Sequence, residues 1–195
     1  MRLHLIGGPG SGKSLVARQL GERFDVPVLD LDEIYWTHEG GDYGDYDARA
    51  DPAGRDEALA EFIRQDDWIV EGAYYRWLGE GFRKADRIFL VNTPRWVRRI
   101  RILRRFLRRK LGRERNRHES LRGLLRILRW NRRYDTRNRL RAQAMLDAMS
   151  LAWTACATLE EVLAELERPP KVLRASASEG QRPRGAGADT AGRPD

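Results

Sequence analysis

Residues 7–14 of the chain match the pattern G-x-x-x-x-G-K-[ST], which binds the phosphates of a nucleotide. Glycines allow the backbone to curl so that its N–H groups point inward at phosphate oxygens. The ammonium group of Lys13 suits the β- and γ-phosphates, and the hydroxyl of Ser14 suits Mg²⁺. We therefore expect ATP and Mg²⁺ at a site formed by Gly7, Gly8, Pro9, Gly10, Ser11, Gly12, Lys13, Ser14 and Leu15.

The elements around this motif support that interpretation over a glycine-rich turn without a ligand. A short apolar segment at residues 2–6 predicts a strand before the motif, and the spacing of apolar residues predicts a helix over 14–24. The N-terminus of such a helix attracts anions. The preference for adenine or guanine stays open.

The rest of the chain alternates between predicted strands and helices, which indicates an α/β fold with a parallel, doubly wound sheet. The remaining strands are predicted at residues 28–31, 68–70, 87–91 and 151–155. Helices are predicted at residues 53–65, 94–111, 119–149 and 159–167, the last opened by a capping box at Thr158. In the helix over 94–111, apolar residues recur at intervals of three and four and leave Arg on the other faces.

Length, cysteine content and hydropathy exclude several classes of protein. A chain of 195 residues has room for one domain, which we place at residues 1–168, and the Pro-, Gly- and Arg-rich residues 169–195 are predicted to be disordered. Cys156 is the single cysteine, so no intramolecular disulfide or Cys-rich metal site forms. No apolar run is long enough for a membrane span, and glycine follows the start too soon for a signal peptide. We expect a cytoplasmic protein.

The net charge of +8 is distributed very unevenly along the chain. Residues 25–67 hold 14 acids and 3 bases, a net charge of −11, whereas residues 93–141 hold 20 bases and 3 acids, a net charge of +17. Basic charge gathered in one stretch predicts an anion-binding face. A purely compositional origin is the alternative, since 33 of the 37 bases are Arg.

Several segments, taken together, resemble known kinases. The form GxPGSGKS is similar to the loop of adenylate kinase-like small-molecule kinases. Residues 31–36, 68–74, 85–90 and 94–96 resemble the motif series of the bacterial "DNA topology modulation" proteins, a branch of the adenylate kinase-like P-loop NTPases. The resemblance covers residues 1–166 and implies a three-layer α/β/α fold with a five-stranded parallel sheet. It also implies an acceptor-side insert at 37–66 and an Arg-rich helical lid at 94–141.

The resemblance also assigns roles to acids at strand ends. Asp32 is similar to the acid that handles the acceptor in shikimate-type kinases, so we expect it to orient or deprotonate an acceptor hydroxyl, with Asp30 the weaker candidate. Glu71 stands where related kinases carry a metal-side Asp, and we expect it to contact Mg²⁺ through water. Asn92 departs from the family, which often has an acid there. A solvated carboxylate at Asp32 and a helix-capping one at Glu71 are the alternatives.

The same resemblance assigns roles to arginines and one tryptophan. Arg101 and Arg105 have the R-x-x-x-R spacing that contacts the base and the phosphates, and Arg137 is expected to close over the γ-phosphoryl group. Arg76, with Arg83 as its rival, is expected to bind the acceptor, and Trp36 to stack on an acceptor ring. Solvated arginines and a packing role for Trp36 are the alternatives. Arg132, Arg133 and Arg139 are further lid candidates.

Three functions are consistent with these observations. The first is a Mg²⁺·ATP-dependent kinase of a small molecule of the nucleotide or nucleoside type. The second is a regulatory protein that binds or slowly hydrolyses nucleoside triphosphates. The third is nucleic-acid binding through residues 94–141, although no base-reading motif is present. For the kinase, the acidic segment 25–67 suggests a neutral or cationic acceptor, or a contact of this segment with a protein. The acceptor and the oligomeric state stay open.

Overall fold

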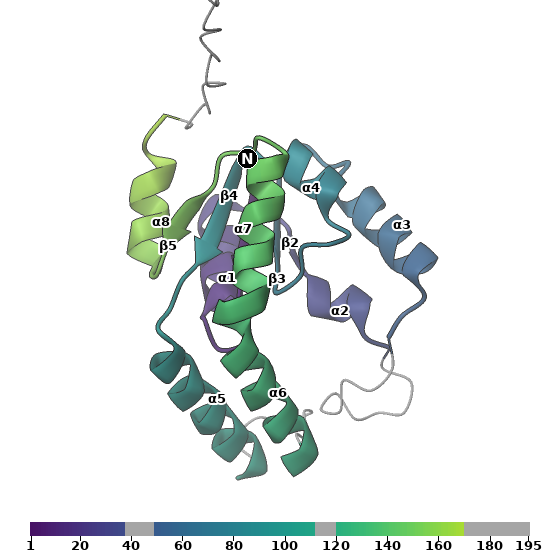
Figure 1. Ribbon diagram of the computed structural model, residues 1–195. Coiled ribbons are helices and arrows are strands. Elements are labelled where there is room, and N and C mark those ends of the chain that lie inside the picture. Colours follow the sequence, from purple (N-terminus) through teal and green to yellow (C-terminus); the bar gives the residue numbers. More distant parts are fainter. Residues whose placement is uncertain (38–48, 112–119, 170–195) are drawn as a thin grey trace, which may run out of the picture.

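The computed structural model describes residues 1–37, 49–111 and 120–169, and within them a five-stranded sheet lies between two layers of helices (Figure 1). All strands are parallel, and the order is β2-β3-β1-β4-β5. The strands are β1 (Arg2–Gly7), β2 (Val28–Asp30), β3 (Trp68–Gly72), β4 (Arg87–Val91) and β5 (Thr154–Cys156). The central position of β1 places the phosphate-binding motif in the middle of the sheet's carboxyl edge.

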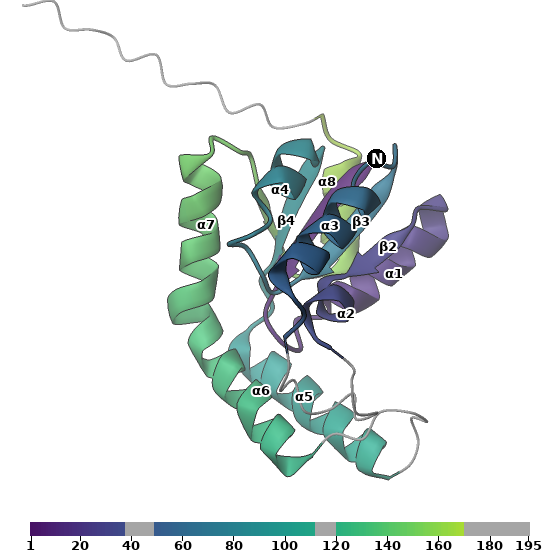
Figure 2. The same ribbon diagram turned by 90° about the vertical axis from the view of Figure 1, so that its right-hand side faces the viewer.

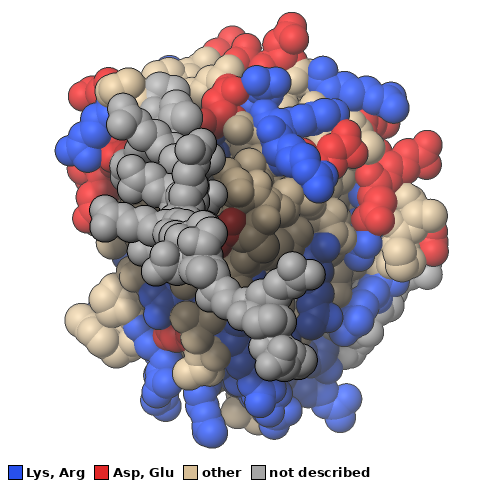
Figure 3. Space-filling model, turned by 45° about the horizontal axis from the view of Figure 1, so that its top comes forward, with Lys and Arg blue, Asp and Glu red and all other residues tan. Residues whose placement is uncertain are grey.

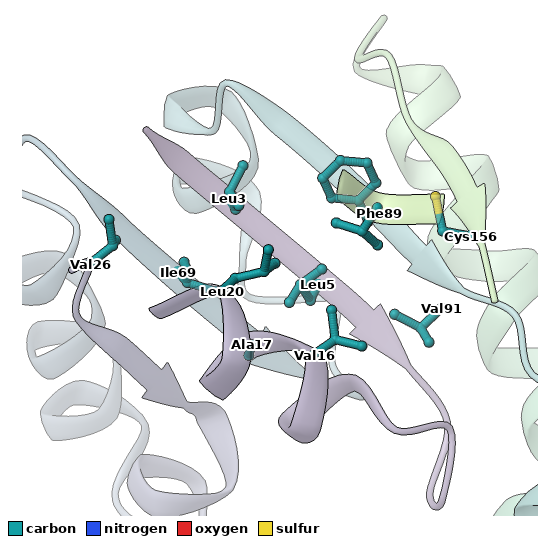
Figure 4. Packing of buried hydrophobic residues seen from close by; sticks show 11 residues of the cluster. Leu3, Leu5, Val16, Ala17, Leu20, Val26, Ile69, Phe89, Val91 and Cys156 are labelled. Atoms are coloured by element: carbon teal, nitrogen blue, oxygen red, sulfur yellow. The ribbon is translucent and has the colours of Figure 1, made fainter. Parts of the chain in front are cut away.

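Helices α1 (Lys13–Phe24) and α8 (Leu159–Leu166) cover one face of the sheet. Leu3 and Leu5 of β1 point to this face, where they meet Leu20 of α1 in a cluster of fully buried side chains (Figure 4). Val162 of α8 extends the same cluster. The alternation of side chains along β1 sends His4 and Ile6 to the other face.

The second face is covered by α3 (Pro52–Phe62), α4 (Gly79–Lys84) and α7 (Arg139–Ala148). Leu59, Phe82 and Leu146 contribute one buried side chain from each helix to a cluster with Ile6 and Val70 of the sheet. A short helix, α2 (Leu31–Tyr35), follows β2 directly. The three layers and the five parallel strands confirm the predicted fold class.

A pair of basic helices extends beyond the carboxyl edge of the sheet (Figure 2). Helix α5 (Arg95–Lys110) packs against α6 (Leu121–Arg133) through a small apolar cluster that includes Ile102, Phe106 and Ile127. Helix α6 continues through a π-helical turn, η1 (Tyr134–Asn138), directly into α7. The helix predicted over 119–149 is therefore one long helical run with a π-turn inside it.

Several boundaries differ from the predicted ones for local reasons. Asp30 accepts a hydrogen bond from the N–H of Asp32, at 2.9 Å, and so caps α2, which begins at Leu31, where we predicted that the strand continues. Helix α4 was not predicted, because its six residues are too few to show a helical period. Residues 38–48 of the insert, the break at 112–118 and nearly all of the tail at 169–195 lie outside the described residues.

The orientation of α5 differs from its sequence pattern. Most of the predicted apolar stripe is exposed: Trp96, Ile100, Leu103, Leu107 and Leu111. Its member Phe106 is buried, together with Arg98 and Ile102, which the predicted stripe did not include. Helix α5 has two apolar faces, and the shorter one makes the contact with α6. None of the helices in the described ranges has the combination of length and apolar character that crossing a bilayer requires.

We predict that Gly21→Ala destabilises the protein by about 1–3 kcal/mol, since a Cβ there overpacks the contact between α1 and the start of β2. That atom would lie 2.5 Å from Val28 Cγ2 and 2.9 Å from the carbonyl oxygen of Val26. The control is Gly54→Ala in α3, where a Cβ meets nothing within 4 Å and which we expect to be neutral or slightly stabilising. Urea-unfolding midpoints measure both, and equal midpoints would contradict the prediction.

Candidate active site

The loop between β1 and α1 adopts a conformation that its glycines make possible. Gly10 and Gly12 have φ angles of 76° and 96°, in the left-handed region that other residues rarely adopt. A Cβ at Gly10 would also lie 2.6 Å from the carbonyl oxygen of Arg98, so the loop packs against α5 at van der Waals distance. The glycines therefore serve both the curl of the loop and its contact with the basic helices.

Two side chains from the region of β4 and α5 hold the same loop from outside. The hydroxyl of Thr93 donates to the carbonyl oxygen of Ser11 at 2.7 Å, and Arg101 Nη1 donates to the same oxygen at 2.8 Å. Within the loop, the N–H of Ser11 donates to the carbonyl oxygen of Gly8 at 3.1 Å. These bonds fix the backbone before any ligand enters.

Lys13 lies between the loop and the acids at the sheet's edge. Its Nζ is 3.0 Å from Glu71 Oε2, and only 12% of the lysine side chain and 2% of the glutamate side chain are exposed. Burial alone would lower the pKa of Lys13, but the carboxylates of Glu71, Asp32 and Asp30 hold that pKa above its ordinary value. Lys13 is therefore charged and paired with Glu71, the partner that it must leave to reach a phosphate.

Asp30 and Glu71 end the neighbouring strands β2 and β3, where they are register partners. Burial, together with the carboxylates of Glu71 and Asp32, raises the pKa of Asp30 to about 7. Asp30 is therefore partly protonated near neutral pH, and its main structural role is to cap α2.

Asp32 makes a short contact that the sequence did not indicate. The Tyr74 hydroxyl donates to Asp32 Oδ1 at 2.6 Å, which leaves Oδ2 for other partners. Burial and the adjacent Asp32 carboxylate raise the pKa of Tyr74 above its ordinary value, so the phenol keeps its proton. The position of Tyr74 shortly after β3 was the only signal available in the sequence.

A cavity of about 990 Å³ is lined by Lys13, Asp30, Asp32 and Tyr74, whereas Glu71 is not among its lining residues. Figure 3 shows the molecule hollowed on one face, with basic side chains gathered below the hollow where α5 and α6 lie. The loop residues Pro9 to Leu15 line the cavity, as do Asp30, Asp32, Trp36, Arg76, Arg101 and Arg105. Most of the residues predicted for the nucleotide, the acceptor and the lid therefore face one space.

Arg137 does not line the cavity, and neither do the further lid candidates Arg132, Arg133 and Arg139. Tyr134, Asn138 and Arg141 line it instead. Asn138, four residues after Tyr134, is the next residue of the π-turn that lines the cavity. Arg108, Arg109 and Arg141 line the cavity and were not singled out from the sequence.

Aromatic side chains form the wall opposite the lid arginines. Tyr35 stacks on Tyr74 with ring centroids 4.3 Å apart, and the Arg55 guanidinium lies 4.2 Å from the ring centroid of Trp77. Trp36 stacks on Trp130 of α6 at 6.0 Å and an interplanar angle of 19°. Trp36 therefore connects the acceptor side to the basic helices, a packing role that its position in the sequence left open.

The charge of the cavity wall differs from that of the segment 25–67. Arg49 and Arg55, two of the three bases in that segment, line the cavity together with Arg76. Among the described acids of the segment, only Asp30, Asp32 and Glu33 line it. The net charge of −11 therefore does not describe the wall, and the expectation of a neutral or cationic acceptor has no support from the structure.

A buried arginine joins the two basic helices behind the loop. Arg98 is fully buried, and its Nη1 and Nη2 donate to Asp135 Oδ1 and Oδ2 at 3.0 and 2.7 Å. Its Nε donates to Asn131 Oδ1 at 2.7 Å, and Nη1 also donates to the carbonyl oxygen of Thr93 at 3.1 Å. Arg98 thus links α5, α6 and η1 to the residue that holds the loop.

The residues predicted for Mg²⁺ suit a magnesium ion in their chemistry. Ser14 offers a hydroxyl and Glu71 a carboxylate, and hard oxygen donors are what Mg²⁺ prefers. Within the described residues no group of three His, Cys, Asp or Glu side chains forms a metal site.

Comparisons with known proteins point to kinases of this fold. A shikimate kinase from Paracidovorax citrulli (strain AAC00-1) is 42% identical over 57 residues, which is 29% of this chain and 31% of that protein. The matched stretch is thus about a third of the relative's length. No protein-family model matches the chain.

Two solved structures are similar at low sequence identity. Shikimate kinase from Aquifex aeolicus vf5 has a TM-score of 0.44 at 17% identity, over 86% of this chain and 96% of that one. Shikimate kinase from Bacteroides thetaiotaomicron has a TM-score of 0.47 at 16% identity, over 85% and 95%. The strand order and the loop after β1 give this chain a P-loop kinase fold. The finer resemblance to the "DNA topology modulation" proteins stays a prediction.

We predict that Asp30→Asn removes a pH dependence of stability. Between the ordinary pKa of 3.8 and about 7, the folded protein keeps a proton on Asp30 that the unfolded chain has released, so stability falls as the pH rises through this interval. Asparagine can keep the helix cap without titrating. Urea unfolding at pH 4 to 7 should show a shallower decline for the variant.

Asp86→Asn is the control, because the contribution of Asp86 to stability changes with pH in the opposite direction. Burial opposes the charge of Asp86, but hydrogen bonds from Arg2 outweigh it and lower the pKa of Asp86. Its contribution to stability is therefore lost as the pH falls, and the variant should lose less stability in acid than the parent protein does. An unchanged decline in Asp30→Asn between pH 4 and 7 would refute the assignment.

We also predict that Arg98→Met destabilises the protein by about 3 kcal/mol, because it leaves Asp135 and Asn131 without their buried partner. The value is at the low end for a broken buried pair, since 28% of the Asp135 side chain is exposed. Arg99→Met, at the neighbouring exposed position, should stay within about 0.5 kcal/mol. Denaturant midpoints compare the two, and a similar loss in both would exclude a special role for Arg98.

Proposed function

We propose that the protein is a P-loop phosphotransferase that transfers the γ-phosphoryl group of ATP to the hydroxyl of a small molecule, with Mg²⁺ as the required ion. One observation carries the proposal: the loop, the Lys13–Glu71 pair and Asp32 line or border one cavity, which continues past the loop to an aromatic wall. The similarity to a stretch of shikimate kinase supports the same class of reaction.

The nucleotide side of the cavity is assigned to the loop and the lid. Main-chain N–H groups of the loop hold the phosphates, and Lys13 turns from Glu71 to the β- and γ-phosphates. Ser14 and Glu71 hold Mg²⁺, Glu71 through water. Arg101 and Arg105 lie on the cavity face of α5 and stabilise the negative charge that develops during transfer.

The acceptor side is assigned to Asp32 and its neighbours. Asp32 takes the proton of the acceptor hydroxyl as the new oxygen–phosphorus bond forms and the bond to the β-phosphate oxygen breaks. Tyr74 keeps one carboxylate oxygen fixed, so the other oxygen is the one that faces the acceptor. Trp36 and the aromatic wall exclude water, and Arg76 binds an anionic or polar group of the acceptor.

The test is incubation with labelled ATP, Mg²⁺ and a pool of small metabolites. We expect a labelled product that Lys13→Ala loses together with stabilisation by nucleotide, since Lys13 grips the phosphates. Asp32→Asn should keep that stabilisation and lose product by about 10²-fold or more. Lys84→Ala, on the distant helix α4, is the control and should match the parent protein.

Other outcomes separate the alternatives. Phosphate release that no acceptor changes would favour a regulatory NTPase. Stabilisation by nucleotide that persists undiminished in Lys13→Ala would contradict the assigned loop. A product that forms equally well in Asp32→Asn would leave the kinase in place and remove Asp32 from the acceptor site.

A further inference from the structure

Helix α5 presents a row of exposed apolar side chains on the side away from the cavity. Trp96, Ile100, Leu103, Leu107 and Leu111 are 68%, 40%, 37%, 56% and 68% exposed, and we call them the α5 seam. The opposite side of the same helix carries Ile102 and Phe106, which are buried against α6. Exposed apolar surface of this extent, rimmed by charge, marks a site of interaction.

The spacing of the α5 seam is that of a helix-pairing surface. Its members follow at intervals of four, three, four and four residues. At about 100° per residue they fall within about 80° of the helix circumference. A stripe this narrow is typical of the a/d seam of a coiled coil.

The charges beside the seam decide which partner fits. Arg99 and Lys110 follow one edge and Arg104 the other, and α5 contains no acidic residue. A second copy of α5 would bring like charges together along both edges, which disfavours pairing between copies. Carboxylates at the flanking positions of a partner helix would instead meet the positive side chains along the whole contact.

We propose that the α5 seam docks an acidic amphipathic helix of a partner protein. Leucine-type side chains of that helix pack between the seam residues, and its glutamates or aspartates pair with Arg99, Arg104 and Lys110. Trp96 supplies a large anchor at one end. The proposal is independent of the phosphotransferase reaction, because the seam lies on the other side of α5 from Arg101 and Arg105.

The test uses the full chain and a labelled synthetic peptide of about four heptads with Leu at a and d and Glu at e and g. Fluorescence anisotropy should show saturable binding that weakens at high salt. The double variant Leu103→Asp/Leu107→Asp should weaken it by at least ~10-fold. The matched control is Leu125→Asp, an exposed leucine of α6 (64%), which should bind as the parent protein does.

A second peptide, vesicle binding and sedimentation distinguish the proposal from its alternatives. The same peptide with Lys in place of Glu should not bind. Absence of binding, equal binding of the two peptides, or binding unchanged in Leu103→Asp/Leu107→Asp would overturn the proposal. So would seam-dependent binding to phosphatidylglycerol vesicles without peptide binding, or a seam-dependent dimer in sedimentation. Stabilisation by nucleotide equal to that of the parent protein shows that the variants are folded. This check does not depend on whether the protein transfers a phosphoryl group.

Discussion

The single ammonium group of Lys13 balances a group of carboxylates at the carboxyl edge of the sheet. Glu71 is almost fully buried, and the carboxyl groups of Asp30 and Asp32 lie close enough to act on the same lysine. Buried carboxylates are tolerated only when a positive group or a proton compensates them. Lys13 compensates Glu71, and Asp30 holds its proton up to near neutral pH. A triphosphate entering here adds negative charge, so the electrostatics of this edge favour its entry together with a divalent cation.

The basic helices depend on a second compensated charge. Arg98 carries its guanidinium into the interior because Asp135, Asn131 and the carbonyl of Thr93 satisfy its donors. Thr93 in turn holds Ser11, and the carbonyl oxygen of Arg98 limits Gly10 to a residue without a side chain. The loop that faces the cavity and the helices above it are thus one hydrogen-bonded assembly.

The sequence was sufficient for the features that local patterns control: the strands, their parallel arrangement and the loop from Gly7 to Ser14. It was insufficient where the local sequence allows two arrangements and tertiary contacts decide which one forms. Helix α5 carries two apolar faces, and only packing against α6 selects the one with Ile102. Arg98 is one arginine among 33, with no local sign of burial. The net charge of residues 25–67 gives no sign that the fold directs Arg49 and Arg55 to the cavity.

The π-turn has a consequence for how the molecule can open and close. No loop separates α6 from α7, and α7 is anchored in the core by Leu146 while α6 carries Trp130 at the cavity. Any swing of the basic helices over the cavity must therefore bend a continuous helix. The backbone hydrogen bonds of this helix are weakest at residues 134–138, where the wider π-turn interrupts their regular spacing. Leu146 fixes one end of this continuous helix in the core, and the π-turn lies beside Gly8, against which Tyr134 rests.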